Sequence, residues 1–465
     1  MTKQTQTQTQ TQTQTQTQTK ADAIAKGMVL GAAVILAAVF VFLLRRRGLH
    51  GGGLFTAYLV VTAALALLHA SAIFWPSSAR QKLLLVTFSV VISVYLTELA
   101  LTLIGKPAPT PVAGTPGTIA TADRRTKTEV IRDLRAAGTN AWPTVHPQMF
   151  LASGGLPVAG GATLLPLGGI SRVRTVYCLE SDAYALFDSD EHGFNNPLGL
   201  HRKGEVDVAL IGDSFVQGAC VQQGEDVTSL LRKASLRALS LGNGGDGPLT
   251  ELATLIEYAA PLRPRVVLWL YYEGNDLLDL ENERHAPVLM RYVDGDFSAH
   301  LPERQDAIDA AMKSLVEKKR DVMKKEEEPQ PGSSVVRALK LSELRGRFKV
   351  VTFPGPTPLF TRTMQRSNET VAGWGGKLYF VYLPEWARYP GQPPRTNWKF
   401  RSYGLVMDAV KKLDVPVIDF QESVAALEDR MSQFPRGQPG HYSPVGYARL
   451  AEVIRARLAA DKVIP

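Results

Sequence analysis

Three long apolar segments near the beginning of the chain constrain its fold more than any other feature. They span Met28–Leu44, Leu54–Trp75 and Leu83–Ile104. A helix needs about 20 apolar residues, at about 1.5 Å each, to cross the hydrocarbon layer of a membrane. Three such segments in succession are not typical of buried helices in a soluble protein. The sequence therefore predicts a three-span membrane region over residues 28–104.

Two ionisable residues lie inside the predicted spans. His69 is in the second span and Glu98 in the third. Ionisable side chains are costly in hydrocarbon, so each is a candidate functional group. The alternative, which we favour, is that they face each other or lie near a helix end.

The charges that flank the spans leave the membrane orientation open. Arg45–Arg47 favour a cytoplasmic first loop, which would also place the C-terminal part of the chain inside. The opposite orientation is favoured by the basic residues on the other side, Lys3, Lys20, Lys26, Arg80 and Lys82.

Two segments around the spans have compositions unlike that of a folded domain. Residues 4–19 are an uninterrupted Gln-Thr repeat with no apolar side chain to bury, which predicts a disordered tail over residues 1–27 rather than a cleavable signal peptide. Residues 105–170 are rich in Pro, Gly, Ala and Thr. They predict a linker or a loosely packed leading segment, with one short helix near Arg125–Ala137.

From residue 171 to the C-terminus, apolar strand-like runs alternate with helical ones. Continuous apolar strands separated by helices predict an α/β fold, a doubly wound parallel sheet that binds ligands at the carboxyl ends of its strands. Residues 281–375 interrupt this rhythm, and we interpret their charged helix at Pro302–Glu328 as the solvated face of an insertion. The predicted strands are Val206–Ile211, Leu236–Leu241, Val266–Tyr272, Leu378–Leu383 and Val415–Phe420. The predicted helices are Asp226–Lys233, Pro248–Tyr258, Tyr403–Leu413, Gln421–Phe434 and Pro444–Ala459.

Charge and cysteine content exclude several classes of function. The net charge is +8, but no basic stripe is interleaved with aromatic residues, so a nucleic-acid partner is not expected. The sequence shows no His/carboxylate cluster or phosphate-binding loop, and we expect neither a metal nor another cofactor. Two cysteines, Cys178 and Cys220, are too few for a disulfide framework. They could form one bridge outside the cytoplasm or be two buried small hydrophobes, and we favour the second.

Four short motifs carry residues that could do chemistry. Ser214 in Ile-Gly-Asp-Ser, Gly245 in Asn-Gly-Gly-Asp and Asn275 in Glu-Gly-Asn-Asp each follow a predicted strand. His441 in Gly-His-Tyr-Ser-Pro stands before the last predicted helix. Each motif alone also fits an ordinary turn or a surface histidine. Because three of them fall at strand ends of one predicted sheet, they point to a single site.

In order, spacing and position, the four motifs resemble those of the SGNH hydrolases, also called the GDSL esterase/lipase superfamily. The resemblance covers about residues 190–460 and implies a flavodoxin-like α/β fold. It also implies that Ser214 is the nucleophile and that His441 is the general base. The Ser214 N–H, the Gly245 N–H and the Asn275 side chain would then hold the oxyanion.

One position departs from the family pattern. The superfamily usually places an Asp three residues before the catalytic His, and position 438 here is Gln. A neutral amide at the corresponding place costs about 10⁴ in rate in serine proteases. Asp419 and Asp276 are candidate substitutes for the missing Asp. The sequence also leaves open a backbone carbonyl in this place, a Ser-His dyad, and a slow or inactive protein.

The resemblance, together with the predicted spans, implies a membrane-anchored serine esterase or O-acyltransferase. Its expected substrate is an acylated glycan or lipid of the cell envelope, with the catalytic domain outside the cytoplasmic membrane. The alternative is a catalytically impaired SGNH-like module that binds glycan or acts as a scaffold, which Gln438 favours.

Overall fold

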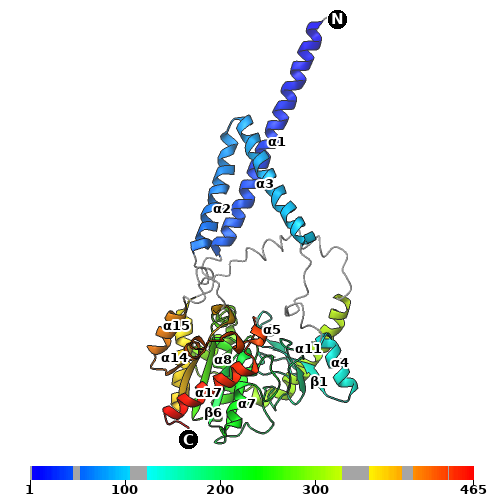
Figure 1. Ribbon diagram of the computed structural model, residues 1–465. Helices are drawn as coiled ribbons and strands as arrows, with labels where there is room; N and C mark the ends of the chain where they lie inside the picture. Colours follow the sequence, from blue (N-terminus) through cyan, green and yellow to red (C-terminus); the bar gives the residue numbers. More distant parts are fainter. Residues whose placement is uncertain are drawn as a thin grey trace. The chain divides into compact units, whose positions relative to one another are not determined.

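The computed structural model describes residues 3–45, 53–104, 123–326, 355–389, 402–437 and 439–464 (Figure 1). The chain divides into two compact units. One contains residues 1–110 and 326–352, and the other contains residues 111–325 and 353–465.

The N-terminal unit consists of three long helices. They are α1 (Lys3–Arg45), α2 (Gly53–Ser71) and α3 (Ser77–Ile104), with a 3₁₀ turn η2 (Ala72–Phe74) between the last two. Their stretches Thr17–Leu44, Thr56–Phe74 and Ser77–Ala100 are each long and apolar enough to cross a membrane, which agrees with the predicted spans.

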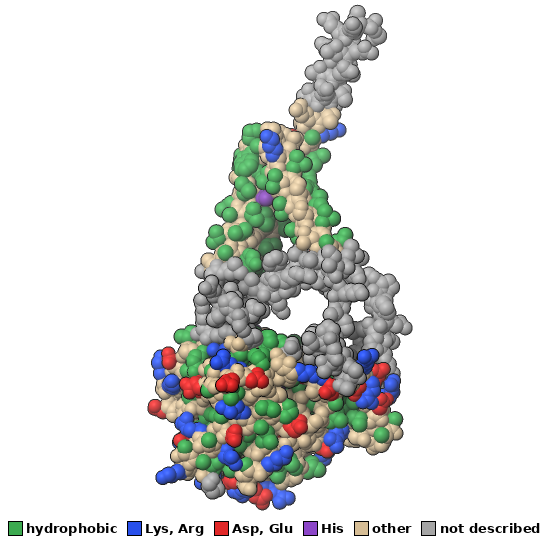
Figure 2. All heavy atoms as spheres, viewed as in Figure 1, with side chains coloured by type: hydrophobic (Ala, Val, Ile, Leu, Met, Phe, Trp, Pro, Cys, Tyr) green, Lys and Arg blue, Asp and Glu red, His purple; other side chains and the backbone are tan. Residues whose placement is uncertain are grey.

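The surface of these helices is largely apolar. Ile35, Leu67 and Leu85 are 66%, 71% and 68% exposed, and Figure 2 shows hydrophobic side chains along this unit. A soluble protein rarely exposes so much contiguous apolar surface, whereas contact with lipid requires it.

The Gln-Thr repeat is helical rather than the disordered tail that its composition predicts. Helix α1 begins at Lys3 and runs through the repeat into the apolar span without a break. Once the apolar span has formed a helix, each further residue adds one backbone hydrogen bond without a new nucleation cost. Gln is also a fair helix former, and this offsets the lower helix propensity of Thr.

Polar side chains inside this unit have defined partners. Arg80, 3% exposed, donates to the backbone oxygens of Ala72 (3.0 Å), Ile73 (3.2 Å) and Trp75 (2.6 Å), and pairs with Asp22 at 2.5 Å. These bonds satisfy carbonyl groups that the end of α2 and the turn η2 leave open.

His69 lies in the last turn of α2, which agrees with the expected position near a helix end. It does not face Glu98, because its two ring nitrogens contact the Leu65 oxygen (2.9 Å) and the Thr87 hydroxyl (3.1 Å). Glu98 is itself fully buried.

The second unit is built on a five-stranded parallel sheet, as predicted. Its strands are β6 (Val208–Gly212), β7 (Ala238–Gly242), β8 (Val266–Tyr272), β9 (Lys377–Leu383) and β10 (Val417–Asp419). They follow the order β7-β6-β8-β9-β10, so that the first strand along the chain lies between the second and the third. This is the flavodoxin-like arrangement, with its switch point between β6 and β8.

Helices cover both faces of the sheet and bury a separate core on each. Leu252, Phe360 and Val406 belong to the core on one face, and Leu231, Val424 and Ile454 belong to the core on the other. The helices of the first face are α8 (Pro248–Thr254, followed by a π-helical turn at Leu255–Ala259), α14 (Pro358–Gly373) and α15 (Ser402–Lys411). Those of the second are α7 (Val227–Lys233), α16 (Phe420–Ala425) and α17 (Pro444–Ala460).

Helix α16 ends at Ala425, well before the predicted limit at Phe434, and two short 3₁₀ turns follow from Met431 onward. In the described part of the chain, three further helices lie between β8 and α14. They are α9 (Asp276–Glu283), α10 (Pro287–Asp294) and α11 (Gln305–Glu326). Short 3₁₀ turns occur at Pro302–Arg304, Trp386–Arg388, Met431–Gln433 and Pro435–Gly437.

The insertion at residues 281–375 is only partly a solvated element. On α11, Ile308 and Met312 are each 1% exposed and pack into the core. Asp309, also on α11, accepts hydrogen bonds from the backbone and hydroxyl of Ser171 at 3.0 and 2.6 Å. One face of the charged helix therefore holds the insertion against the domain, and residues 327–354 lie outside the described residues.

The expected linker is wrong for its described part, residues 123–170. Phe150 and Leu167, 2% and 1% exposed, belong to the main core. These apolar side chains are scattered among Pro and Gly without helix or strand periodicity, so the pattern did not reveal their burial. The elements of this part are α4 (Lys127–Ala136), α5 (Gln148–Leu151), a β2–β3 pair (Leu156–Pro157 and Thr163–Leu164) and β1 (Ala141–Pro143). Strand β1 forms a small sheet, β1-β4-β5, with the later strands β4 (Arg174–Val176) and β5 (Leu186–Asp188).

Candidate active site

Ser214 stands at the carboxyl end of β6, at the switch point of the sheet. It is the first residue of the short helix α6 (Ser214–Gln217), and Asp213 caps this helix by accepting the Phe215 N–H at 2.9 Å. Asp213 is 1% exposed, and burial raises its pKa to about 6. The sequence Gly-Asp-Ser thus ends a buried strand and presents a half-buried serine hydroxyl at the edge where such sheets bind ligands.

The structure brings His441 to Ser214 across 227 residues of sequence. The His441 Nε2 atom lies 2.8 Å from the Ser214 Oγ atom. The imidazole also packs against the Phe215 ring, with 4.9 Å between ring centroids. A serine hydroxyl within hydrogen-bond reach of an imidazole is the arrangement that activates a nucleophile.

A carboxylate holds the other side of the imidazole, and it comes from Glu180. Its Oε1 lies 2.8 Å from His441 Nδ1, and its Oε2 accepts the His441 backbone N–H at 2.8 Å. Burial raises the pKa of Glu180, but the hydrogen bonds from His441 outweigh it and bring the pKa below the usual value of 4.5. The charged carboxylate fixes the proton on Nδ1, which leaves Nε2 free to accept the Ser214 proton.

Neither carboxylate considered from the sequence takes this role. Asp419 accepts the Gln421 N–H at 3.0 Å and the Tyr403 hydroxyl. Asp276 is fully buried and accepts the Tyr272 N–H at 2.8 Å. Gln438 lies outside the described residues.

Sequence reasoning missed Glu180 because the residue lies 261 positions before His441, in the loop between β4 and β5. Its one local trace is Gly440, where a Cβ atom would lie 2.6 Å from the Glu180 Oε2 atom. Glycine at position 440 therefore lets the Glu180 carboxylate come close to the backbone beside His441. This contact is visible only in the folded structure.

Cys178 and Cys220 form a disulfide, with 5.2 Å between their Cα atoms. The favoured interpretation, two separate buried hydrophobes, is wrong, and the alternative of one bridge is right. Cys178 lies shortly after β4, and Cys220 lies shortly after α6. The fold brings these two segments side by side. The bonds Tyr177 N–H to Ala185 oxygen (2.9 Å) and Ala185 N–H to Cys178 oxygen (2.8 Å) fix that side of the bridge.

Gly245 and Asn275 lie at the same sheet edge as Ser214. Gly212, Gly242 and Leu270 are paired at the carboxyl ends of the parallel strands β6, β7 and β8, and the three site residues follow these ends within a few positions. Gly245 has a φ of +79°, a conformation that favours glycine. Asn275 precedes α9, and its amide donates to Asp279 at 2.6 Å.

The glycine loop after β7 is held by hydrogen bonds to helix α6, which begins at Ser214. The buried Gln217 of α6 accepts the Gly244 N–H at 2.9 Å and donates to the Asn243 side chain at 3.3 Å. On the other side, Gln148 donates to the Gly245 oxygen. These bonds fix the Gly245 peptide relative to Ser214 before any substrate binds.

We therefore predict that Gln217→Leu lowers both stability and activity. The Gly244 N–H would lose its acceptor in a buried place, which costs about 1–3 kcal/mol. The free energy of unfolding in urea measures this loss. Gln365→Leu on the exposed side of α14 is the control, with a change within about 0.5 kcal/mol expected there. An equal effect of the two substitutions would contradict the role of Gln217.

A pH dependence of stability follows from Glu180. Because its pKa is lower in the folded than in the unfolded chain, its ionisation stabilises the fold fully above the unfolded value of about 4.5. This contribution is lost as the pH falls through the lower, folded pKa. The difference in unfolding free energy between the wild type and Glu180→Gln should be larger at pH 7 than at pH 3. If the difference in unfolding free energy were the same at both pH values, the lowered pKa of Glu180 in the folded chain would be contradicted.

Several buried acids lie near the same edge of the sheet. Burial, reinforced by neighbouring carboxylates, raises the pKa of Asp279 to about 8 and that of Asp246 well above its usual value. Burial also raises the pKa of Glu283 to about 7. Burial thus opposes the ionisation of these acids and disfavours negative charge at this edge of the sheet.

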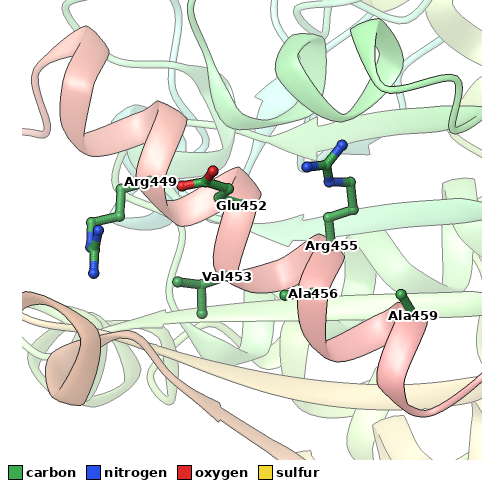
Figure 3. A pocket seen from close by; sticks show the side chains of 6 residues that line it. All are labelled: Arg449, Glu452, Val453, Arg455, Ala456 and Ala459. Atoms are coloured by element: carbon green, nitrogen blue, oxygen red, sulfur yellow. The ribbon is translucent and has the colours of Figure 1, made fainter.

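One group of described residues has the spacing of metal ligands. Atoms of Glu180, Cys220 and His441 lie within 4.8 Å of one another. They do not fit a metal, because the Cys220 sulfur is bonded to Cys178 and the other two side chains bond to each other. A separate surface hollow of about 600 Å³ runs along α17 (Figure 3). Its described lining residues, Arg449, Glu452, Val453, Arg455, Ala456 and Ala459, include none of the candidate site residues.

Comparisons with known proteins gave matches among solved structures alone. No family model and no curated protein matches the chain. One similar structure is described as a lipolytic protein of the G-D-S-L family from Desulfitobacterium hafniense DCB-2, with 14% identity and a TM-score of 0.30 over 55% of this chain and 98% of that one. A second is the lipase/acylhydrolase from Enterococcus faecalis, with 14% identity and a TM-score of 0.31 over 56% and 96%. A third is a family 3 carbohydrate esterase from Clostridium thermocellum, with 12% identity and a TM-score of 0.27 over 56% and 96%.

The fold class predicted from the sequence is confirmed. The strand order β7-β6-β8-β9-β10 is the flavodoxin-like one that the resemblance implies. Three of the four motifs follow the carboxyl ends of β6, β7 and β8, and the fourth precedes the last helix. The chain thus has a doubly wound, flavodoxin-like α/β fold, preceded by three long apolar helices.

Proposed function

We propose that the chain is a membrane-anchored serine hydrolase of the SGNH type, with carboxylic esters as substrates. The observation that carries this proposal is the continuous chain Glu180–His441–Ser214, whose two contacts are each 2.8 Å. A nucleophile, a base within reach of it and a third group that orients the base are together the requirement for nucleophilic catalysis.

In the proposed mechanism, His441 Nε2 takes the hydroxyl proton as Ser214 Oγ attacks the ester carbonyl. Glu180 stabilises the imidazolium that forms. The Ser214 N–H, the Gly245 N–H and the Asn275 amide hold the oxyanion, and one such donor can contribute about 3–4 kcal/mol. His441 then gives the proton to the departing alcohol, which leaves an acyl group on Ser214.

The second half-reaction decides between two activities. If water attacks the acyl-Ser214 ester, the protein is an esterase. If a sugar hydroxyl attacks it, the protein is an O-acyltransferase. We propose an acylated glycan or lipid of the cell envelope as the substrate, because three apolar helices are suited to hold the catalytic unit at a membrane.

We place the catalytic unit outside the cytoplasmic membrane. The disulfide Cys178–Cys220 favours this side, since disulfides persist in oxidising compartments and are rare in the cytoplasm. A C-terminal alkaline phosphatase fusion, which is active only outside the cytoplasm, should therefore be active. Activity from a cytoplasm-dependent reporter alone would contradict this orientation.

The alternative function, a non-catalytic binding or scaffold module, depended on the missing Asp at position 438. Glu180 supplies a carboxylate to His441 Nδ1, so the replacement by Gln438 is no longer a reason to expect an impaired site.

The proposal is tested on the purified full-length chain in detergent. It should hydrolyse p-nitrophenyl acetate and release acetate from O-acetylated glycans, and His441→Ala should do neither. Added unacetylated oligosaccharide distinguishes the two activities, because a transferase would form acetylated oligosaccharide. A folded wild type with no turnover of either ester would contradict the proposal.

A further inference from the structure

The disulfide joins the two segments that carry the acid and the nucleophile. Cys178 lies two residues before Glu180, and Cys220 lies three residues after the last residue of α6, the helix that begins with Ser214. The disulfide Cys178–Cys220 therefore forms a covalent link two residues from Glu180 and six residues from Ser214. The third member of the site, His441, is contacted by both Glu180 and Ser214.

The disulfide also lies directly against the catalytic imidazole. The Cys220 Sγ atom is 3.7 Å from His441 Nδ1, the nitrogen that Glu180 also contacts. Cys220 has a φ of +62°, a conformation uncommon for a residue with a side chain. The disulfide thus lies beside the Nδ1 atom of His441 and joins the backbone segments that contain Cys178 and Cys220.

Among the described residues, the Glu180 side chain is held mainly by His441. Its carboxylate oxygens contact the His441 ring and backbone, and both side chains are partly exposed, by 18% for Glu180 and 25% for His441. The loop that carries Glu180 lies between two strands of three residues each, β4 and β5. Backbone bonds between Tyr177, Cys178 and Ala185 and the pair Asp182–Arg436 also hold this loop, and the disulfide adds the one covalent restraint, two residues from Glu180.

We propose that the Cys178–Cys220 disulfide is the positioning element for Glu180, and that reduction of this bond lowers the catalytic rate by releasing the Glu180 loop. The inference rests on the proposed function. The reaction that releases the loop transfers two electrons and two protons from a dithiol such as dithiothreitol to the bridge. The S–S bond breaks, two thiols form, and the dithiol becomes a cyclic disulfide. Cys178 is partly exposed and Cys220 is buried, so we expect the dithiol to attack the bridge at Cys178.

The expected effect is large because catalysis is sensitive to small displacements. A shift of about 1 Å in a positioned group can cost about 10²-fold in rate. We therefore expect the reduced full-length protein, with its thiols blocked by iodoacetamide, to lose at least about 10-fold in kcat, with little change in KM. Reduction without alkylation should be reversed by oxidised glutathione.

The decisive experiment is a double cycle between the bridge and Glu180. Wild type, Cys178→Ala/Cys220→Ala, Glu180→Gln and the triple variant are assayed for p-nitrophenyl acetate hydrolysis and for fluorophosphonate labelling. If the bridge acts through Glu180, removing it lowers kcat in the wild type but changes kcat by less than about two-fold in the Glu180→Gln background. An equal loss in both backgrounds would show a merely structural bridge and would overturn the inference.

Two further readouts keep the outcomes apart. Reduction of the wild type, compared by circular dichroism before and after, tests the same inference without a substitution, and unchanged kcat after complete reduction would overturn it. An oxidised, folded wild type that neither turns over ester nor binds the fluorophosphonate would instead contradict the proposed function itself.

Discussion

Replacing Ser214 with alanine is expected to lower ester hydrolysis by about 10⁵–10⁶-fold, because the acyl group then has no oxygen to attach to. The residual rate would come from the oxyanion donors and from substrate binding. His441→Ala should lose nearly as much, since the two residues act as a unit across a 2.8 Å contact. The measurement is kcat for p-nitrophenyl acetate with the full-length protein in detergent.

Ser181→Ala is the matched control for this experiment. Ser181 is an exposed serine next to Glu180, and its hydroxyl makes one 3.4 Å contact with the Ala183 oxygen. Its replacement removes the same hydroxyl near the same site and should change kcat by less than about two-fold. A Ser214→Ala variant that retains most of the wild-type rate would exclude Ser214 as the nucleophile.

Replacing Glu180 with glutamine is expected to lower kcat by about 10²–10⁴-fold, and to change KM little. The upper value is the cost of a neutral amide at the corresponding place in a serine protease, where the imidazole takes the wrong tautomer. Here the amide could also donate to Nδ1, so that the proton moves to Nε2 and opposes proton transfer from Ser214. The substitution also removes the negative charge of Glu180, which would otherwise stabilise the His441 imidazolium.

Two acidic residues serve as controls for Glu180. Asp182→Asn removes a negative charge from the same loop, but Asp182 pairs with Arg436 rather than with the imidazole. Asp419→Asn tests the carboxylate that the sequence made a candidate and that instead bonds to Tyr403 and Gln421. Both should keep kcat within about three-fold of the wild type. If Asp419→Asn instead lost as much as Glu180→Gln, the assignment of Glu180 would be wrong.

The parts of the fold that follow from sequence are those with strong periodicity or length. The three apolar spans were predictable because contact with lipid requires a long apolar helix surface. The strands β6, β7 and β8 were predictable because continuous burial leaves an uninterrupted apolar run. Ser214, Gly245 and Asn275 were recognisable for the same reason, since each follows a strand end. His441 followed from its position before a well-marked last helix.

The parts that sequence did not reveal depend on long-range contacts. Residues 123–170 contain few regular elements, yet Phe150 and Leu167 fill the core between such elements. Glu180 and the Cys178–Cys220 bridge belong to a small sheet whose strands are three residues long, too short for a period to be read. The carboxylate that contacts the imidazole comes from such a segment, so that only the folded structure reveals it.

The most direct test of the central claim is covalent labelling of the folded, full-length protein with a fluorophosphonate, followed by mass spectrometry of its peptides. A Glu180–His441–Ser214 site predicts one adduct, located on Ser214, that forms rapidly in the wild type, much more slowly in Glu180→Gln and not at all in His441→Ala. A folded wild type that remains unlabelled, or an adduct on any other serine, would contradict it.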